Sequence, residues 1–214
     1  MIIDKSIKRV TVGNTDIQRI MHGGGILWQK NTVPGPTKLI GGNLQAGFYG
    51  EVPAKDFITG DELARRIGLT AGVSQYSGEP WLKFSYLGKV EFVAKKPFRY
   101  SISWNNINDA NAVYGNKTMD INGKKYKIRL MKADSEWDKL IVPLCSTWNL
   151  GYTDGVLITN VNYGNGSRAL CQELNGTELA YYRGQYGFRK KDTCGTKLAV
   201  ASCGWRPVLE LIKE

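Results

Sequence analysis

The first 31 residues constrain this chain most, because they form a unit that is too small to fold alone. The segments 7–12, 17–21 and 26–29 are rich in apolar residues and are separated by glycine-containing turns. This pattern predicts a small N-terminal β-meander over residues 1–31. A chain below about 40 residues rarely folds without a disulfide, a metal or a partner, and no cysteine lies in this segment. The meander must therefore pack against the rest of the chain or against another protein.

Residues 32–37 form a Pro/Gly linker that bears on this choice. Pro34-Gly35-Pro36 favours an extended, semi-rigid spacer, which we expect to hold the meander away from the rest of the chain. Docking to a partner is then the better interpretation, with exposed strand edges pairing with a neighbour's sheet. The apolar residues predicted to anchor this contact are Val10, Val12, Ile17, Ile20, Ile26 and Trp28.

The remaining residues, 38–214, are long enough for one further domain at roughly 100–200 residues per domain. Thr59 and Glu62 resemble a capping box, and Gly68 is a stop signal, so a helix is predicted between them. Asn122-Gly123 predicts a tight hairpin turn. Other expected elements are strands at 81–86, 89–94, 98–104, 117–121, 124–131, 156–161, 198–201 and 208–212, and short helices at 107–113 and from Ser135 to Pro143. Short helices early and short strands late are typical of an α+β fold.

The net charge and the length of the apolar runs limit the classes of partner that we expect. Lys and Arg outnumber Asp and Glu by 29 to 19, a net charge of +10, but the cations are scattered along the chain. Nucleic-acid binding requires cations clustered on one face, so none is expected. No apolar run approaches the roughly 20 residues that cross a bilayer, and no apolar signal segment opens the chain. We therefore expect neither a membrane span nor secretion.

Motifs that carry catalysis or bind metals are not found. The four cysteines include no CxxC pair, so zinc is not expected; they are interpreted as free buried thiols, with one disulfide as the alternative. The single histidine, His22, falls in a glycine-rich turn. A Ser-His-Asp or Cys-His mechanism needs the histidine beside its nucleophile, so His22 is interpreted as a turn residue. The sequence thus predicts a protein that is not an enzyme and that uses no cofactor and no metal.

Two segments resemble known proteins. The end of the chain, 204–211 (GWRPVLEL), is similar to the closing strand of C-type-lectin-like domains of the sulfatase-modifying-factor and phage-tropism type, and Glu136-Trp137-Asp138 resembles the same domains. Residues 47–53 (GFYGEVP), with 81–84, 95–97 and 126–130, resemble a domain recurrent in virion proteins of tailed phages. The resemblance covers about 38–214. It implies a C-type-lectin-like display domain preceded by the small N-terminal β-meander.

The N-terminal segment carries a separate resemblance. Residues 8–13, 17–20 and 26–28 are similar to short leader modules on tail and baseplate components of phages that infect Gram-positive bacteria. This resemblance implies that the leader inserts into the particle while the body is displayed. Residues 1–31 would then bind other virion proteins.

The chain departs from two functional patterns of lectin-like domains. Glu79-Pro80-Trp81 and Trp104-Asn105-Asn106 are the nearest fragments to the calcium ligand motifs, and they lack clustered carboxylates, so no calcium-bound sugar is expected. The related oxidising enzymes carry two close cysteines before the final Gly-aromatic-Arg. Here Cys194 and Cys203 are nine residues apart, which speaks against that chemistry.

Aromatic and cationic residues alternate in 181–191 (YYRGQYGFRKK), which offers flat faces for sugar rings and cations for acidic groups. The alternative is a twisted strand with inward rings and solvated charges. Trp81, Trp104, Trp137 and Trp205 lie in apolar segments and are expected in the core. The residues predicted to bind a ligand are Tyr181, Tyr182, Arg183 and Tyr186, together with Trp148 and Tyr163 from Gly- and Asn-rich loops.

These observations predict a structural virion protein of a tailed phage, made in the host cytoplasm and oligomeric within the particle. It would be a tail or baseplate component that contacts other subunits or the host surface, where cell-wall carbohydrate is the candidate ligand. A capsid decoration or head fibre would show the same features. The alternative from another class is an enzyme acting on cell-wall glycan through the carboxylates of Glu173 and Glu178, which would need to lie about 5–9 Å apart.

Overall fold

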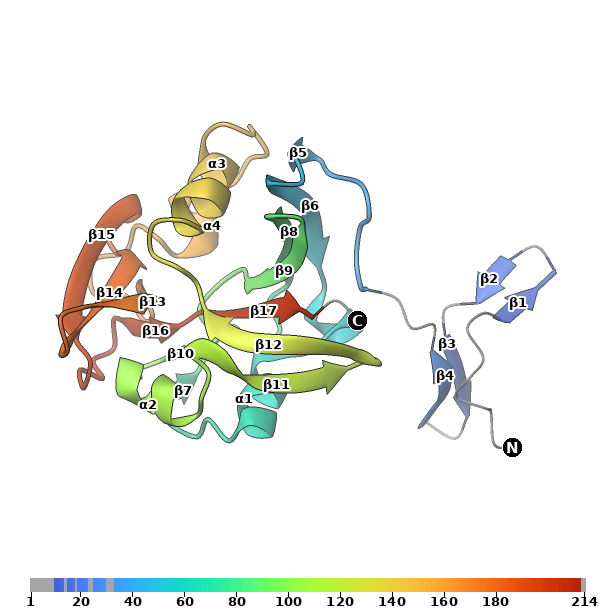
Figure 1. The fold of residues 1–214 in the computed structure, drawn as a ribbon, viewed down its shortest axis with the longest axis horizontal. Coiled ribbons are helices and arrows are strands. Elements are labelled where there is room, and N and C mark those ends of the chain that lie inside the picture. Colours follow the sequence, from blue (N-terminus) through green and yellow to red (C-terminus); the bar gives the residue numbers. More distant parts are fainter. Residues whose placement is uncertain (1–9, 14, 18, 23–24, 30–32, 213–214) are drawn as a thin grey trace.

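The body of the protein is built from two β-sheets, and the computed structural model describes residues 10–13, 15–17, 19–22, 25–29 and 33–212 (Figure 1). The seven-stranded sheet has the order β11(Tyr114–Ile121), β12(Lys124–Leu130), β17(Pro207–Leu211), β9(Lys89–Ala94), β8(Trp81–Tyr86), β6(Ala46–Val52), β5(Gly41–Gly42). The six-stranded sheet has the order β15(Gly187–Gly195), β14(Leu179–Gly184), β13(Arg168–Asn175), β16(Cys203–Trp205), β10(Arg99–Tyr100), β7(Val73–Ser74). The neighbouring strands are antiparallel except β13 and β16, which are parallel.

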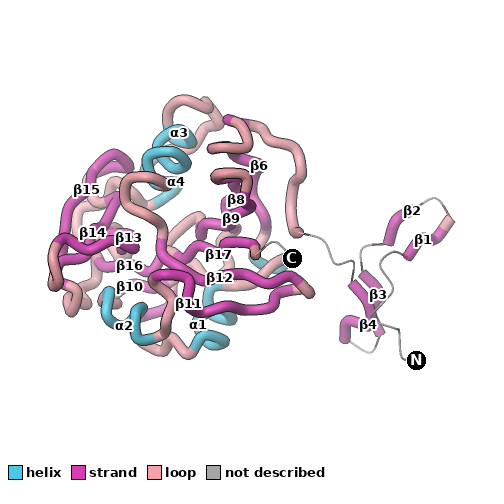
Figure 2. Tube along the Cα trace, in the orientation of Figure 1, coloured by secondary structure: helices cyan, strands magenta, loops and turns pink. Residues whose placement is uncertain are grey.

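A few short helices lie between the strands and cover parts of the sheets (Figure 2). They are the 3₁₀ turn Ala54–Asp56, α1(Gly60–Ile67), α2(Trp104–Asp109), the π-helical turn Trp137–Ile141, α3(Val142–Cys145) and α4(Asp154–Leu157). Mostly antiparallel sheets with few short helices agree with the α+β class that the sequence predicts.

The last two strands join the sheets to one another. β16 belongs to the six-stranded sheet, β17 belongs to the seven-stranded sheet, and Arg206 alone lies between them. Its buried guanidinium donates from Nε to Ala94 O (2.8 Å) and from Nη2 to Lys95 O (2.7 Å), and it lies 5.4 Å from the centre of the Trp137 ring. Burial lowers the pKa of Arg206 to about 10, so the group is still a cation at neutral pH.

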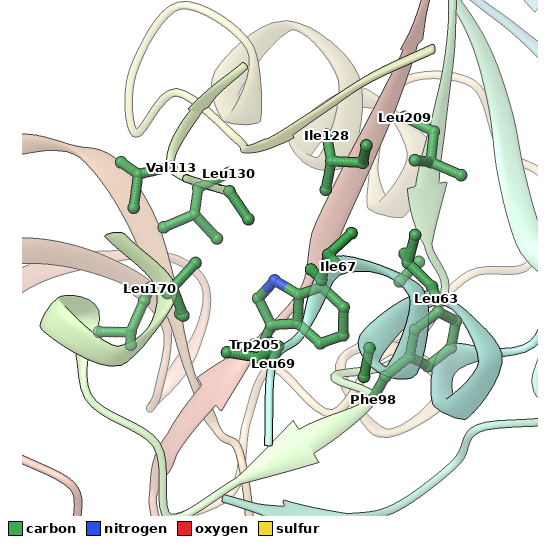
Figure 3. Close-up of a cluster of buried hydrophobic side chains, with 14 of the residues drawn as sticks. Leu63, Ile67, Leu69, Phe98, Val113, Ile128, Leu130, Leu170, Trp205 and Leu209 are labelled. Carbon is green, nitrogen blue, oxygen red and sulfur yellow. The ribbon is translucent and has the colours of Figure 1, made fainter. Parts of the chain in front are cut away.

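The core packs around this crossing. Trp205 is completely buried and is surrounded by side chains from α1 and from both sheets, including Leu63, Ile67, Leu170 and Leu209 (Figure 3). The four tryptophans predicted to lie in the core are all buried, which confirms that prediction: Trp81, Trp104, Trp137 and Trp205.

Local signals placed several elements correctly. The Thr59 hydroxyl accepts the N–H of Glu62, and Gly68 closes α1 in the left-handed conformation, φ +77°. The Glu62 carboxylate, however, accepts from Arg65 rather than from the amide of Thr59. The hairpin β11–β12 turns at Asn122-Gly123 with φ +54° and +75°, the geometry for which Asn-Gly is favoured.

Two of the expected strands were wrong. Residues 156–161 are not a strand, because α4 ends in a left-handed Ile158. Residues 198–201 form a turn, closed by hydrogen bonds from Leu198 N to Gly195 O and from Cys203 N to Val200 O. Both segments are short apolar runs among glycines, a pattern that does not separate strand from turn.

The expected helix 107–113 begins earlier, at Trp104, because Ser103 and Asn106 cap each other reciprocally. As a result, the expected strand 98–104 shrinks to β10. Pro143 does not end the helix that was expected from Ser135. A π-helical turn precedes it, and the proline lies in the first turn of α3, where its missing N–H costs nothing.

The N-terminal residues form two hairpins rather than one three-stranded meander. β1(Val10–Val12) pairs with β2(Thr15–Ile17), and β3(Arg19–His22) pairs with β4(Gly25–Gln29). Among the described residues, these strands pair only within their own hairpins. Val12 is 69% exposed, whereas Val10, Ile17 and Ile20 are half-buried; the side chains of Ile26 and Trp28 lie outside what the structure describes.

Residues 34–36 of the linker are bonded to the body. The buried ammonium of Lys83 on β8 donates to Pro34 O (2.8 Å) and Pro36 O (2.7 Å), and lies 3.5 Å from Gly35 O. It also lies 5.3 Å from the centre of the Tyr49 ring. Burial lowers the pKa of Lys83 to about 8. The cation thus holds residues 34–36 against the sheet.

We expect Lys83→Met to release this segment while the body stays folded. Methionine fills the buried space but cannot bond the three carbonyls, so trypsin should cleave after the exposed Lys38 several-fold faster, as measured by mass spectrometry of early digests. Lys89→Met is the control, because Lys89 lies on the neighbouring strand and its ammonium contacts Glu210 instead. Equal cleavage rates in wild type and Lys83→Met would contradict the clamp.

Candidate functional site

Two exposed tyrosines from separate segments meet on the surface. Tyr163 lies in the loop between α4 and β13, and Tyr186 lies in the turn between β14 and β15. They are 70% and 46% exposed. Interaction with the side chain of Tyr163 raises the pKa of Tyr186. The two side chains therefore lie close to each other although they are 23 positions apart in the sequence.

The backbone of both tyrosines has an unusual conformation. Tyr163 and Tyr186 adopt positive φ angles of +55° and +66°. For a residue other than glycine this region costs about 1–2 kcal/mol, so the surrounding structure must stabilise it. Strain of this kind collects at functional sites, which makes the pair a candidate.

Asp154 fixes the two segments to each other. Its Oδ1 accepts from the Thr159 hydroxyl (2.6 Å) and from the N–H of Phe188 (2.7 Å). In addition, the N–H of Gly187 donates to Thr159 O (2.6 Å). These bonds connect the loop that carries Tyr163 to the turn that carries Tyr186, so the rings are positioned before any ligand arrives.

Arg168, the first residue of β13, lies beside the tyrosines. Its guanidinium lies 5.0 Å from the centre of the Tyr182 ring, and its Nε donates to Gln185 Oε1 (2.7 Å). Gln185 is fully buried, and its Nε2 has no hydrogen-bond partner among the described residues. None of the ion pairs within the described part of the chain involves Arg168.

A pocket of about 310 Å³ opens at this place and is lined by Tyr163, Arg168, Leu198, Val200, Ala201 and Ser202. We refer to Tyr163, Tyr186, Arg168 and the loop 198–202 as the tyrosine–arginine site. Its lining carries one cation and no carboxylate. Such a site can stack a flat ligand on aromatic faces and pair an acidic group with the guanidinium.

Two thiols lie below Arg168. The neighbouring Cys194 thiol and the guanidinium of Arg168 lower the pKa of the Cys203 thiol, although burial opposes this effect. The same contact with Cys203 raises the pKa of Cys194, which is the donor. Both side chains are buried in the core cluster around Trp205. The structure holds all four cysteines as free thiols: Cys145, Cys171, Cys194 and Cys203.

The structure brings together two of the six residues predicted to bind a ligand, Tyr163 and Tyr186. Tyr182 is 4% exposed and lies under Arg168, and Arg183 is 3% exposed and donates to Asp138 Oδ1 (2.6 Å). These two side chains therefore support the site or the core and do not face solvent.

The other two predicted residues lie elsewhere. Tyr181 is half-buried with the Lys191 ammonium 4.8 Å from its ring centre, and Trp148 packs over Gly41 at the edge of the other sheet. The stretch 181–191 is a β-hairpin rather than one strand. Sequence reasoning missed Arg168 and the loop 198–202, since no local pattern distinguishes an arginine at the start of a strand.

The two carboxylates considered for glycan cleavage are engaged separately. Glu173 Oε2 accepts the N–H of Ala133 (2.8 Å). Glu178 lines a different pocket of about 340 Å³ together with Asn105, Thr196 and Lys197, and Glu173 is not part of that lining.

The most perturbed carboxylate lies inside the body. Arg129 donates to Glu91 (2.7 Å), to Glu136 (2.7 Å) and to Glu210 (3.0 Å), and Lys89 contacts Glu210 as well. Burial raises the pKa of Glu91 to about 8; Glu136 and Glu210 add to the rise, and Arg129 opposes it. Because Glu91 is 1% exposed, this cluster holds strands β9, β12 and β17 together rather than offering an acid to a substrate.

The raised pKa makes stability depend on pH in a defined direction. In the folded protein Glu91 keeps its proton up to about pH 8, whereas in the unfolded chain it keeps the proton only up to about pH 4.5. The free energy of unfolding therefore falls as pH rises between these values, by at most about 1.4 kcal/mol per pH unit. Glu91→Gln removes this dependence. Its stability relative to wild type, measured by urea unfolding, should increase from pH 5 to pH 8.

Glu79→Gln serves as the control, because Glu79 lies in a partly exposed ion pair with Lys96. It should follow the wild type at every pH. The assignment of Glu91 as the titrating group is wrong if the stability of Glu91→Gln relative to wild type stays constant or decreases from pH 5 to pH 8.

Comparison with models of known families, with curated proteins and with solved structures gives no match. In the described part of the chain, no helix is long and apolar enough to cross a membrane. Within those same residues, no group of three or more His, Cys, Asp or Glu side chains is placed to hold a metal ion. The function therefore has to be argued from the site itself.

Proposed function

We propose that this chain is a structural virion protein of a tailed bacteriophage, of the tail or baseplate type, that displays its body for contact with the host surface. The observation that carries the proposal is that the chain has two regions suited to binding, one in the N-terminal hairpins and one on the body. Two small hairpins precede a linker held by Lys83, and the body carries a preformed tyrosine–arginine site. Within the body, residues 33–37 and the six-stranded sheet lie on opposite sides (Figure 1).

The hairpins support attachment to a partner. A two-stranded hairpin is marginal in water, because it buries little apolar surface and leaves both outer edges unpaired. Val12 remains 69% exposed, and the described strands find no pairing in the sheets of the body. Pairing with the sheet of another virion subunit would satisfy these edges, and repeated copies around the particle would make the protein oligomeric there.

A C-type-lectin-like body is the finer fold proposal. In its support, the final segment 204–211 that resembles the closing strand of such domains runs through β16 and β17 into the centre of the seven-stranded sheet. Trp137, from the second resembling segment, packs against Arg206 of that crossing. Long loops between short strands leave room for a displayed surface.

Removal of residues 1–32 should leave a folded body that no longer joins particles. The buried core clusters draw their fully buried members from Phe48 onward, so the body retains its packing. Incorporation is measured by immunoblot of purified particles and is expected to fall at least about tenfold. Normal incorporation of the shortened chain would refute the N-terminal anchor.

Substitution of both exposed tyrosines should separate display from assembly. Tyr163→Ala with Tyr186→Ala should leave incorporation unchanged and reduce adsorption of particles to host cells by about tenfold or more, because both aromatic faces are lost. Tyr181→Ala, a half-buried tyrosine on the neighbouring strand, is the control and should adsorb normally. Adsorption unchanged in the double variant would contradict a host-contact role for this surface.

Imaging of labelled particles tests the position in the virion. A label at the tail tip agrees with the proposal, whereas a label spread over the capsid identifies a head fibre or decoration instead.

A further inference from the structure

The guanidinium of Arg168 is the unusual feature of the tyrosine–arginine site, because it is held in place and yet has no carboxylate partner among the described residues. The Tyr182 ring lies on one side at 5.0 Å, and Gln185 Oε1 accepts from Nε at 2.7 Å. The thiol of Cys203 lies on another side. A guanidinium has more N–H donors than these contacts use, so donors remain for a ligand in the pocket.

Gln185 fixes this guanidinium from the protein side. It is fully buried, its Oε1 accepts from Arg168 Nε, and its Nε2 donor is without a partner in the described residues. Gln185 does not line the pocket, so it positions the arginine and does not itself contact a ligand there. Arg168 therefore keeps N–H donors toward the pocket beyond those that contact Gln185 and Cys203.

The dimensions and the rings indicate what kind of acceptor fits. The pocket of about 310 Å³ has the volume of one small cyclic unit, at the lower end of ordinary ligand sites. The exposed rings of Tyr163 and Tyr186 offer apolar faces with hydroxyl groups at their edges, which suits the mixed apolar and polar faces of a sugar ring. One cation in the lining suits one acidic group per unit.

We infer that the tyrosine–arginine site binds an acidic polysaccharide, with Arg168 pairing to a carboxylate or phosphate of the polymer while Tyr163 and Tyr186 pack against the adjacent ring. This inference rests on the proposed host-surface role and names the ligand class for it. The net charge of +10 would also attract such a polymer at low salt. A single-stranded nucleic acid also carries rings and phosphates, so it is the competing ligand that the titration below includes.

Calorimetric titration of the full-length chain tests the ligand class directly. The probes are an oligoglucuronate, an oligo(glucose 1-phosphate), a neutral maltooligosaccharide and an oligothymidylate. We expect one or both acidic polymers to bind at least about tenfold more tightly than the neutral sugar and the oligonucleotide. The glucuronate and glucose phosphate arms distinguish a carboxylate from a phosphate as the acidic group, since both carry a sugar ring. Equal affinity for neutral and acidic sugars, or tightest binding of the oligonucleotide, overturns the inference.

Variants assign the binding to this place. Arg168→Gln should weaken the acidic polymer at least about tenfold, while Arg189→Gln, which changes an exposed arginine on β15, should not. Because Arg168 also contacts Tyr182, Tyr163→Ala is a second variant at a 70% exposed position that the core does not need, and it should weaken binding as well. Unchanged affinity in Tyr163→Ala and in a folded Arg168→Gln overturns the inference.

The outcomes also separate this inference from the proposed function. If acidic polymers fail to bind but the double tyrosine variant still loses adsorption to cells, the ligand class is wrong and the host-contact role stands. If the chain is missing from purified particles, the proposed function is wrong whatever the titrations show.

Discussion

The crossing from β16 to β17 at Arg206 is the constraint on which the rest of the structure depends. A buried cation without a carboxylate partner is costly, and here backbone carbonyls of residues 94 and 95 and the face of Trp137 take the place of a counter-ion. Those carbonyls come from the end of β9 in one sheet, whereas β16 belongs to the other. The contacts of this single guanidinium therefore fix the relative position of the two sheets, while its Nη1 has no hydrogen-bond partner among the described residues.

The tyrosine–arginine site follows from that crossing. Cys203, at the start of β16, lies opposite Arg168 in the parallel pair with β13, so the position of β16 sets where the guanidinium emerges. The loop 198–202 leads directly into the same strand and forms one wall of the pocket. A displacement of the crossing would move the arginine and the pocket wall together.

Local signals predicted most of the elements, while contacts between distant segments decided the rest. Gly68 and Asn122-Gly123 ended or turned their elements as expected, because left-handed backbone favours these residues wherever they occur. The aromatic composition of 181–191 drew attention to Tyr186, which is exposed, and equally to Tyr182 and Arg183, which strand pairing buries beneath the surface. The place of Arg168 in the site could not be predicted from the sequence, because Gln185, Tyr182 and the loop 198–202 lie near it only in the folded chain.

The two ends of the molecule differ in how they can bind. In the body, Asp154 and the left-handed tyrosines order the site in advance, so a ligand need not supply the free energy of ordering it. In the hairpins, the described strands pair only with each other, so the proposed partner would have to supply most of their stabilisation. The clamp of Lys83 on residues 34–36 connects these two regimes, because it fixes the point on the body from which the N-terminal segment extends. Under the proposed function, the body's own core would set the orientation of the tyrosine–arginine site relative to the attachment. A variant that loosens the clamp would then change that orientation without altering the residues of the site or of the hairpins.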